Sequence, residues 1–178
     1  NVSALQLRDL EFVTTVADAL RDTHLAPERL LLEITESMLI NEAALTREAL
    51  SQLRALGVRV AIDDFGTGYS SLAYLRELAV DVVKIDRSFI RDLAVNADHR
   101  ALTSTMLALA DGLSMTAIAE GVETDVELSE LRHLGCEFPQ GFLSSRPIPA
   151  AAIDPLLDEY EAHATRSTSS DATVPDPS

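Results

Sequence analysis

Residues 58–64 read Val58-Arg59-Val60-Ala61-Ile62-Asp63-Asp64, a short apolar run that ends in two adjacent carboxylates. A run of this length, rich in β-branched residues and preceded by Gly57, is typical of a buried strand. The stretch therefore predicts a strand over Val58–Ile62 with Asp63 and Asp64 at its carboxyl end.

Similar runs recur on both sides of this stretch, and helical patterns separate them. Further strands are expected at Leu30–Ile34, Val80–Ile85, Met115–Ala119 and Cys136–Phe142. Helical spacing marks Leu5–Leu20, a segment from a cap at Asn41 towards Gly57, a short helix at Leu72–Leu78, Asp98–Leu113, and Asp125–Leu134 before Gly135. Strand–helix alternation of this kind predicts an α/β fold with a parallel sheet.

Polar residues stand at or near the carboxyl ends of the successive strands: Glu33, Asp63, Lys84, Glu120 and Gln140. In a (β/α) barrel these ends converge on one face, where the active site lies. An open sheet would spread them along an edge. The pattern favours a barrel.

Composition narrows the function. The chain has 178 residues, 47% of them apolar, and a net charge of −15. Nucleic acid polymers are poor candidates as partners, because non-specific binding to them relies on Lys and Arg at the phosphates. No membrane segment or signal peptide is visible in the sequence. The single cysteine, Cys136, cannot form an internal disulfide, which fits a reducing compartment such as the cytoplasm.

The convergent residues form an oxygen-rich set with one lysine, which suits Mg²⁺ or Mn²⁺. Two adjacent aspartates can each face a different ion, as in a two-metal phosphoryl-transfer site. Lys84 could then orient a water and offset negative charge, and Glu120 could act as metal ligand and general base. Taken singly, these carboxylates are more often helix caps and Lys84 a surface lysine, so the interpretation depends on their joint placement.

The glycine-rich stretch and the histidines can be explained by structure alone, and for the glycine-rich stretch a functional role is the alternative. The glycine-rich stretch from Asp64 to Ser71 is either an ordinary turn with a serine cap or a lid or dimer-contact loop beside Asp63. All four histidines are expected on the surface: His24, His99, His133 and His163.

The residues resemble the EAL family of cyclic di-GMP phosphodiesterases. The matching stretches are Asn1-Val2-Ser3, Leu32-Glu33-Ile34-Thr35-Glu36-Ser37, Ile62-Asp63-Asp64-Phe65-Gly66-Thr67-Gly68-Tyr69-Ser70-Ser71, Val83-Lys84-Ile85-Asp86, Ala119-Glu120-Gly121-Val122-Glu123-Thr124, Gln140-Gly141-Phe142 and Ser145-Arg146-Pro147. The resemblance runs from Asn1 to about Pro149, and the ordered set is very specific. It implies a TIM-like barrel that hydrolyses cyclic di-GMP to linear pGpG with two Mg²⁺ or Mn²⁺ ions.

The resemblance also implies roles for individual residues. Asn1, Glu33 and Asp63 resemble ligands of a first metal ion, and Asp64 a ligand of the second with Glu120 nearby. Lys84 resembles the catalytic lysine, and Glu120 the general base. Glu36 resembles the glutamate that anchors the Asp-Phe-Gly loop, and Glu123 and Gln140 resemble supporting residues.

The Glu-Ala-Leu signature and the first barrel strands do not occur in the sequence. An incomplete barrel has open edges and exposed apolar strand faces, so we expect aggregation, oligomerisation or partial order. The expected organisation is a partial phosphodiesterase domain over residues 1–160 and a disordered tail over 161–178. A homodimer and an upstream sensory or GGDEF domain are expected partners. Two alternatives remain open: an inactive module that binds cyclic di-GMP or a protein, and a different metallohydrolase on a similar barrel.

Overall fold

The computed structural model describes residues 1–9, 11–41, 43–68, 75 and 80–158. The chain divides into two compact units, Asn1–Ser144 and Ser145–Ser178.

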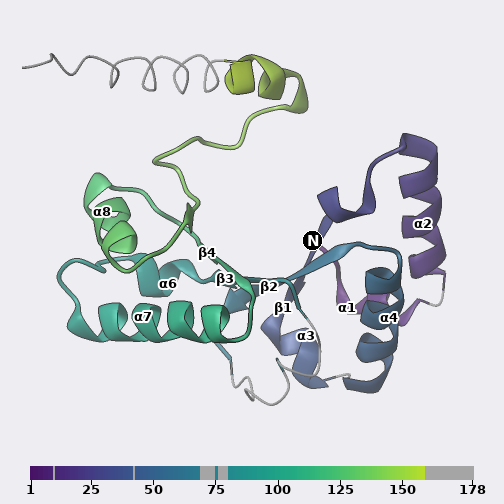
Figure 1. Cartoon of the computed structure of the whole chain (residues 1–178), viewed down its shortest axis with the longest axis horizontal. Coiled ribbons are helices and arrows are strands. Elements are labelled where there is room, and N and C mark those ends of the chain that lie inside the picture. The colour runs from purple at the N-terminus through teal and green to yellow at the C-terminus, as the bar shows by residue number, and fades with distance from the viewer. Residues whose placement is uncertain (10, 42, 69–74, 76–79, 159–178) are drawn as a thin grey trace, which may run out of the picture. The chain divides into compact units, whose positions relative to one another are not determined.

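The first unit is built on a five-stranded parallel sheet (Figure 1). Its strands are β1 (Leu31–Thr35), β2 (Arg59–Phe65), β3 (Val82–Ile85), β4 (Thr116–Ala119) and β5 (Phe138–Pro139). Their order in the sheet is β1-β2-β3-β4-β5, so each strand pairs with the next one along the chain. In a doubly wound open sheet the order of the strands reverses at a switch point, whereas in a barrel each strand pairs with the next one. The sheet is therefore an arc of a TIM-like (β/α) barrel, with five strands where a complete one has eight.

The helices are α1 (Ala4–Arg8), α2 (Phe12–Thr23), α3 (Glu36–Asn41), α4 (Ala43–Ala55), α6 (Arg87–Ile90), α7 (Ala97–Gly112) and α8 (Asp125–His133), with a short η1 (Pro27–Arg29). Local chemistry fixes several boundaries. Asn96 accepts hydrogen bonds from the first amides of α7, and Thr124 forms a capping box with Glu127 at α8. α4 is followed by Gly57, whose φ of +90° suits a helix-ending glycine.

Side-chain alternation gives the sheet two different faces. Ile34, Val60, Ile62 and Val83 belong to one buried apolar cluster with residues of α2 and α4. Ile85 and Ala119 belong to a second cluster, which includes α6 and α8 residues. α4 packs on β2, and α7 packs on β3 and β4. The residues between these apolar positions, among them Glu33, Asp63 and Lys84, are left for the opposite face.

Three predicted elements differ in the structure. The pattern over Leu5–Leu20 is two helices, because the chain is extended at Asp9, whose Oδ1 accepts from the Glu11 amide at 2.9 Å. Asn41 ends α3 instead of capping the next helix, and α3 itself is too short to show a helical period. The last strand is two residues long, since its continuation turns at Gly141. The helix expected at Leu72–Leu78 lies outside the described residues, apart from the buried Leu75.

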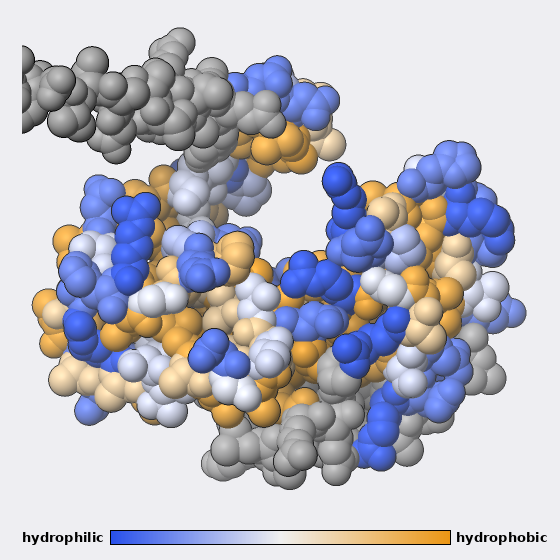
Figure 2. Space-filling model, in the orientation of Figure 1, coloured by the Kyte–Doolittle hydropathy of each residue, from blue (hydrophilic) through white to orange (hydrophobic). Residues whose placement is uncertain are grey.

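Some large apolar side chains are exposed on the first unit. Phe138 on the edge strand β5 is 51% exposed, and Val95 is 84% exposed. Figure 2 shows hydrophobic residues beside hydrophilic ones on the visible face. Exposed apolar groups on an edge strand are an aggregation hazard, but the predicted aggregation or oligomerisation stays a prediction.

The second unit contains the short helix η2 (Ala150–Ala152), and residues 153–158 are helical. The tail predicted over 161–178 lies outside the described residues, as does His163. Among the described residues, no helix has both the length and the apolar character that a membrane span requires.

Candidate active site at the carboxyl ends of the strands

Four consecutive strands bring charged side chains to one point. β1 carries Glu33, β2 carries Asp63 and β3 carries Lys84, while Glu120 follows β4 directly. The Lys84 Nζ atom lies 2.9 Å from Glu33 Oε1, 3.2 Å from Asp63 Oδ1 and 2.7 Å from Glu120 Oε1. The Lys84 side chain is only 6% exposed. Residues distant in sequence thus form one ionic cluster around a buried ammonium.

The electrostatics of the cluster follow from this arrangement. Burial alone would lower the pKa of Lys84, but hydrogen bonds to Glu120 and Glu33 raise that pKa well above its ordinary value. Burial raises the pKa of Glu120, and the charges of Asp63 and Glu33 add to this, although Lys84 opposes it. The raised pKa of Lys84 and the raised pKa of Glu120 are compatible, because the lysine faces three carboxylates while each carboxylate faces one lysine and two like charges. Lys84 is therefore an ammonium group at neutral pH.

The two aspartates lie within a β-bulge. Ile62 pairs with Val83 and Phe65 with Ile85, so β2 has one more residue than β3 between these pairs. Asp64 has a φ of +56°, a left-handed conformation that non-glycine residues adopt rarely. Burial raises the pKa of Asp64, and repulsion by Asp63 and by Asp86 adds to the effect. The strand predicted to stop at Ile62 continues through both aspartates, and the bulge changes the regular alternation of their side chains.

The glycine loop after β2 is attached to the start of α3 by Glu36. Glu36 is 2% exposed, and its Oε2 accepts hydrogen bonds from the amides of Gly66 at 3.0 Å and Gly68 at 3.2 Å. A Cβ atom on Gly68 would lie 2.8 Å from Glu36 Oε1. This close approach explains the glycine at position 68. Residues 69–71 of the predicted lid or dimer-contact loop lie outside the described residues.

The remaining predicted residues lie around this cluster. Glu123 and the exposed Gln140 line a cavity of about 250 Å³ together with Glu120, Arg87, Gly121, Gly141 and Phe142. The Val2 amide donates to the Glu33 carbonyl at 2.8 Å, which places the exposed Asn1 next to β1.

Of the histidines, His24 and His133 are exposed and His99 is half-buried.

The donor chemistry fits a hard divalent cation. Glu33, Asp63, Asp64 and Glu120 outnumber the lone Lys84 by three charges, and oxygen ligands are those that Mg²⁺ and Mn²⁺ prefer. In the described part of the chain, no group of three carboxylate, imidazole or thiol side chains is arranged to hold a metal. Three of the four carboxylates, those of Glu33, Asp63 and Glu120, instead lie against the ammonium of Lys84.

The sequence assigned no role to two neighbours of the cluster. Asp86 acts on the pKa of Asp64 and caps α6, and Arg87 Nη2 lies 3.1 Å from Glu123 Oε1. Both follow Lys84 within three positions, but a strand pattern that ends at Ile85 contains no signal for the direction of the next turn.

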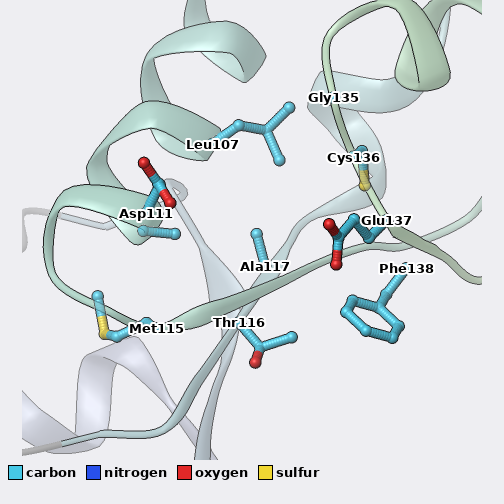
Figure 3. Close-up of a pocket in the computed structure, with 10 residues that line it drawn as sticks. Leu107, Asp111, Met115, Thr116, Ala117, Gly135, Cys136, Glu137 and Phe138 are labelled. Carbon is cyan, nitrogen blue, oxygen red and sulfur yellow. The ribbon is translucent and has the colours of Figure 1, made fainter.

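A second cavity, of about 230 Å³, lies at the other end of the strands (Figure 3). Leu107 and Asp111 of α7 line it together with Thr116 at the start of β4 and Glu137 just before β5. Cys136, which also lines it, is 5% exposed, and burial raises the pKa of its thiol. The amino ends of barrel strands usually serve stability, and this cavity is separate from the ionic cluster.

Comparisons with known proteins agree with this geometry. The sequence model of the EAL domain matches residues 1–147. The bifunctional diguanylate cyclase/cyclic di-GMP phosphodiesterase MucR of Pseudomonas aeruginosa is 47% identical over 153 residues, which are 86% of this chain and 22% of that protein. The chain spans about a fifth of the length of the curated relatives that it matches first.

Solved structures share the fold. The crystal structure of the EAL domain of Mycobacterium smegmatis DcpA is 42% identical with a TM-score of 0.84, covering 89% of this chain and 71% of that one. The complex of Klebsiella pneumoniae BlrP1 with manganese and cyclic di-GMP is 35% identical with a TM-score of 0.75, covering 80% of this chain and 36% of that one. The predicted TIM-like barrel, incomplete in this chain, is confirmed.

Proposed function

Because the chain belongs to the EAL domain family, we propose that it is the catalytic part of a phosphodiesterase that hydrolyses cyclic di-GMP to linear pGpG. The observation that carries the proposal is the convergence of Glu33, Asp63 and Glu120 on the buried Lys84. Such a cluster is costly for folding, since it collects like charges away from water. A catalytic role explains why the sequence has it. The name of MucR supports the proposed substrate.

We propose that Asn1, Glu33 and Asp63 would hold one Mg²⁺ or Mn²⁺ ion, and that Asp64 would hold a second, with Glu120 as a further metal ligand. The manganese complex of BlrP1 supports this proposal. When bound, two such ions activate water and stabilise charge on a phosphodiester undergoing in-line displacement.

The protein's own groups supply proton transfer and orientation. Glu120, with its raised pKa, is suited to take a proton from the attacking water as general base. Lys84 remains positively charged, so it can orient that water and offset the negative charge that develops on phosphate. Glu123 and Gln140 line the cavity beside Glu120 and would support the nucleotide there. Glu36 would hold the glycine loop beside Asp64 in place through its two amide hydrogen bonds.

The organisation of the whole protein is part of the proposal. The phosphodiesterase domain would cover residues 1–160, with a tail over 161–178, and would act in the cytoplasm. The combined activities in the name of MucR support an additional GGDEF domain upstream. A homodimer is proposed from the family resemblance alone.

The test is an assay of the protein at the length that its gene encodes. Cyclic di-GMP is incubated with the protein in Mg²⁺ or Mn²⁺, and the products are separated by liquid chromatography and identified by mass spectrometry. We expect pGpG, and we expect EDTA to abolish its formation and added Mg²⁺ to restore it. Binding of cyclic di-GMP without pGpG in either metal would instead identify a receptor module.

A further inference from the structure

The segment that carries Glu120 is held on one side by β5 and the turn after it. The Val122 amide donates to the Gln140 carbonyl at 3.0 Å. A Cβ atom on Gly141 would lie only 2.1 Å from the Val122 carbonyl oxygen. The Val122 backbone therefore packs directly against the Gln140–Gly141 turn.

On the other side, the same segment is held by Arg87. A Cβ atom on Gly121 would lie 2.5 Å from Arg87 Cγ, so the aliphatic part of the arginine packs on the Gly121 backbone. Gly121 has a φ of +72°, which disfavours other residues there independently. The Arg87 guanidinium then reaches Glu123, with Nη2 3.1 Å from Oε1. The Arg87 side chain thus contacts both Gly121 and Glu123.

These contacts join the two segments that carry the lysine and the base. The Glu120 amide donates to the Ile85 carbonyl at 3.1 Å, and Glu120 Oε1 lies 2.7 Å from Lys84 Nζ. Arg87, the first residue of α6 and three residues after Lys84, adds a further contact between the two segments. We propose that Arg87 is a positioning residue, which holds residues 120–123 so that the Glu120 carboxylate stays against Lys84. The inference rests on the proposed function.

The contact pattern favours an effect on rate over an effect on stability. The Arg87 and Glu123 side chains are 54% and 40% exposed, and exposed ion pairs contribute little to folding. A displacement of a catalytic group by about 1 Å, in contrast, can cost roughly a hundredfold in rate. Loss of the Arg87 charge should therefore lower kcat by roughly tenfold to a hundredfold and leave KM nearly unchanged.

The experiment compares Arg87→Met and Arg87→Lys in the protein at its full encoded length. Methionine keeps an aliphatic chain over Gly121 without the charge, and lysine keeps both chain and charge. Arg91→Met is the matched control, because Arg91 lies just after α6 and its side chain is 73% exposed beside Asp92. Steady-state kinetics with cyclic di-GMP give kcat and KM. Hydrogen exchange of the Glu120 and Val122 amides reports the position of the segment without any need for turnover.

We expect Arg87→Met to lose roughly tenfold or more in kcat and to exchange these two amides about twofold to fivefold faster, with α7 amides unchanged. Arg87→Lys should recover most of kcat, and Arg91→Met should match the wild type. An unchanged kcat in Arg87→Met, or a loss confined to KM, would overturn the positioning role. A wild-type protein that makes no pGpG would refute the proposed function instead, and the exchange rates would still decide whether Arg87 holds the segment.

Discussion

Replacement of Lys84 by methionine tests the ionic cluster at its centre. The change keeps an unbranched side chain one atom shorter than that of lysine and removes the charge that three carboxylates share. Removing one partner of a buried ion pair costs about 3–5 kcal/mol, because the remaining charge is left uncompensated. Glu33, Asp63 and Glu120 are still 18–23% exposed and keep some hydration. We therefore expect the lower end, about 3 kcal/mol, at neutral pH without divalent metal.

The loss should depend on pH. Lys84 has a raised pKa in the folded protein, so its stabilising effect is fully present below the ordinary lysine value of 10.5. Without Lys84, burial raises the pKa of Glu120 further above its ordinary value of 4.5. The unfolded chain then ionises first as pH rises through 4.5, so the penalty grows above that pH and fades below it.

Hydrogen exchange of amides in β1 to β4 measures this locally, whatever other domains the protein has. At neutral pH a loss of about 3 kcal/mol corresponds to exchange roughly a hundredfold faster in Lys84→Met. Arg21→Met is the control, because Arg21 is 69% exposed beside Asp18 and should change exchange by less than about fivefold. Equal exchange in Lys84→Met and wild type at neutral pH would refute the view that Lys84 neutralises these half-buried carboxylates.

Two further predictions concern the loop and the cysteine. Glu36→Ala leaves the Gly66 and Gly68 amides without their carboxylate acceptor, and each hydrogen bond to a charged group contributes about 1.5–3 kcal/mol. Proteolysis within residues 64–68 should therefore be at least about tenfold faster than in the control Glu48→Ala, which changes an exposed glutamate. Equal cleavage rates in both variants would contradict the anchoring role of Glu36. Burial raises the pKa of the Cys136 thiol, so iodoacetamide at pH 7 should alkylate it at least about tenfold more slowly in the folded protein than in urea. Peptide mass spectrometry measures both rates, and equal rates would show that the cavity lined by Cys136 opens freely.

Much of this site could be predicted from sequence, because parallel strands place their carboxyl ends together. Glu33, Asp63, Lys84 and Glu120 each occur at or near the carboxyl end of an apolar run. The structure brings the three carboxylates within hydrogen-bonding distance of the Lys84 ammonium. The barrel followed from the same observation. The strand order, in which each strand pairs with the next, supports it independently.

Other features depend on contacts that no local pattern contains. The bulge at Asp63–Asp64 arises from the pairing register with β3, and an apolar run gives no information about register. Arg87 stands at the start of a four-residue helix, too short to show a period, and its partners Gly121 and Glu123 are more than thirty positions away. The six-residue α3 was missed for the same reason as α6.

The most direct measurement of the proposed chemistry is single-turnover hydrolysis of cyclic di-GMP by Asp63→Asn, in the protein at its encoded length with saturating Mg²⁺. Asparagine keeps the shape of the side chain and removes the charge that lies 3.2 Å from Lys84 Nζ. The matched control is Asp18→Asn, since Asp18 lies on α2 and is 50% exposed. Wild type and Asp18→Asn should form pGpG at equal rates, and Asp63→Asn should be at least about a hundredfold slower. Equal rates in all three proteins would contradict catalysis by this cluster of carboxylates.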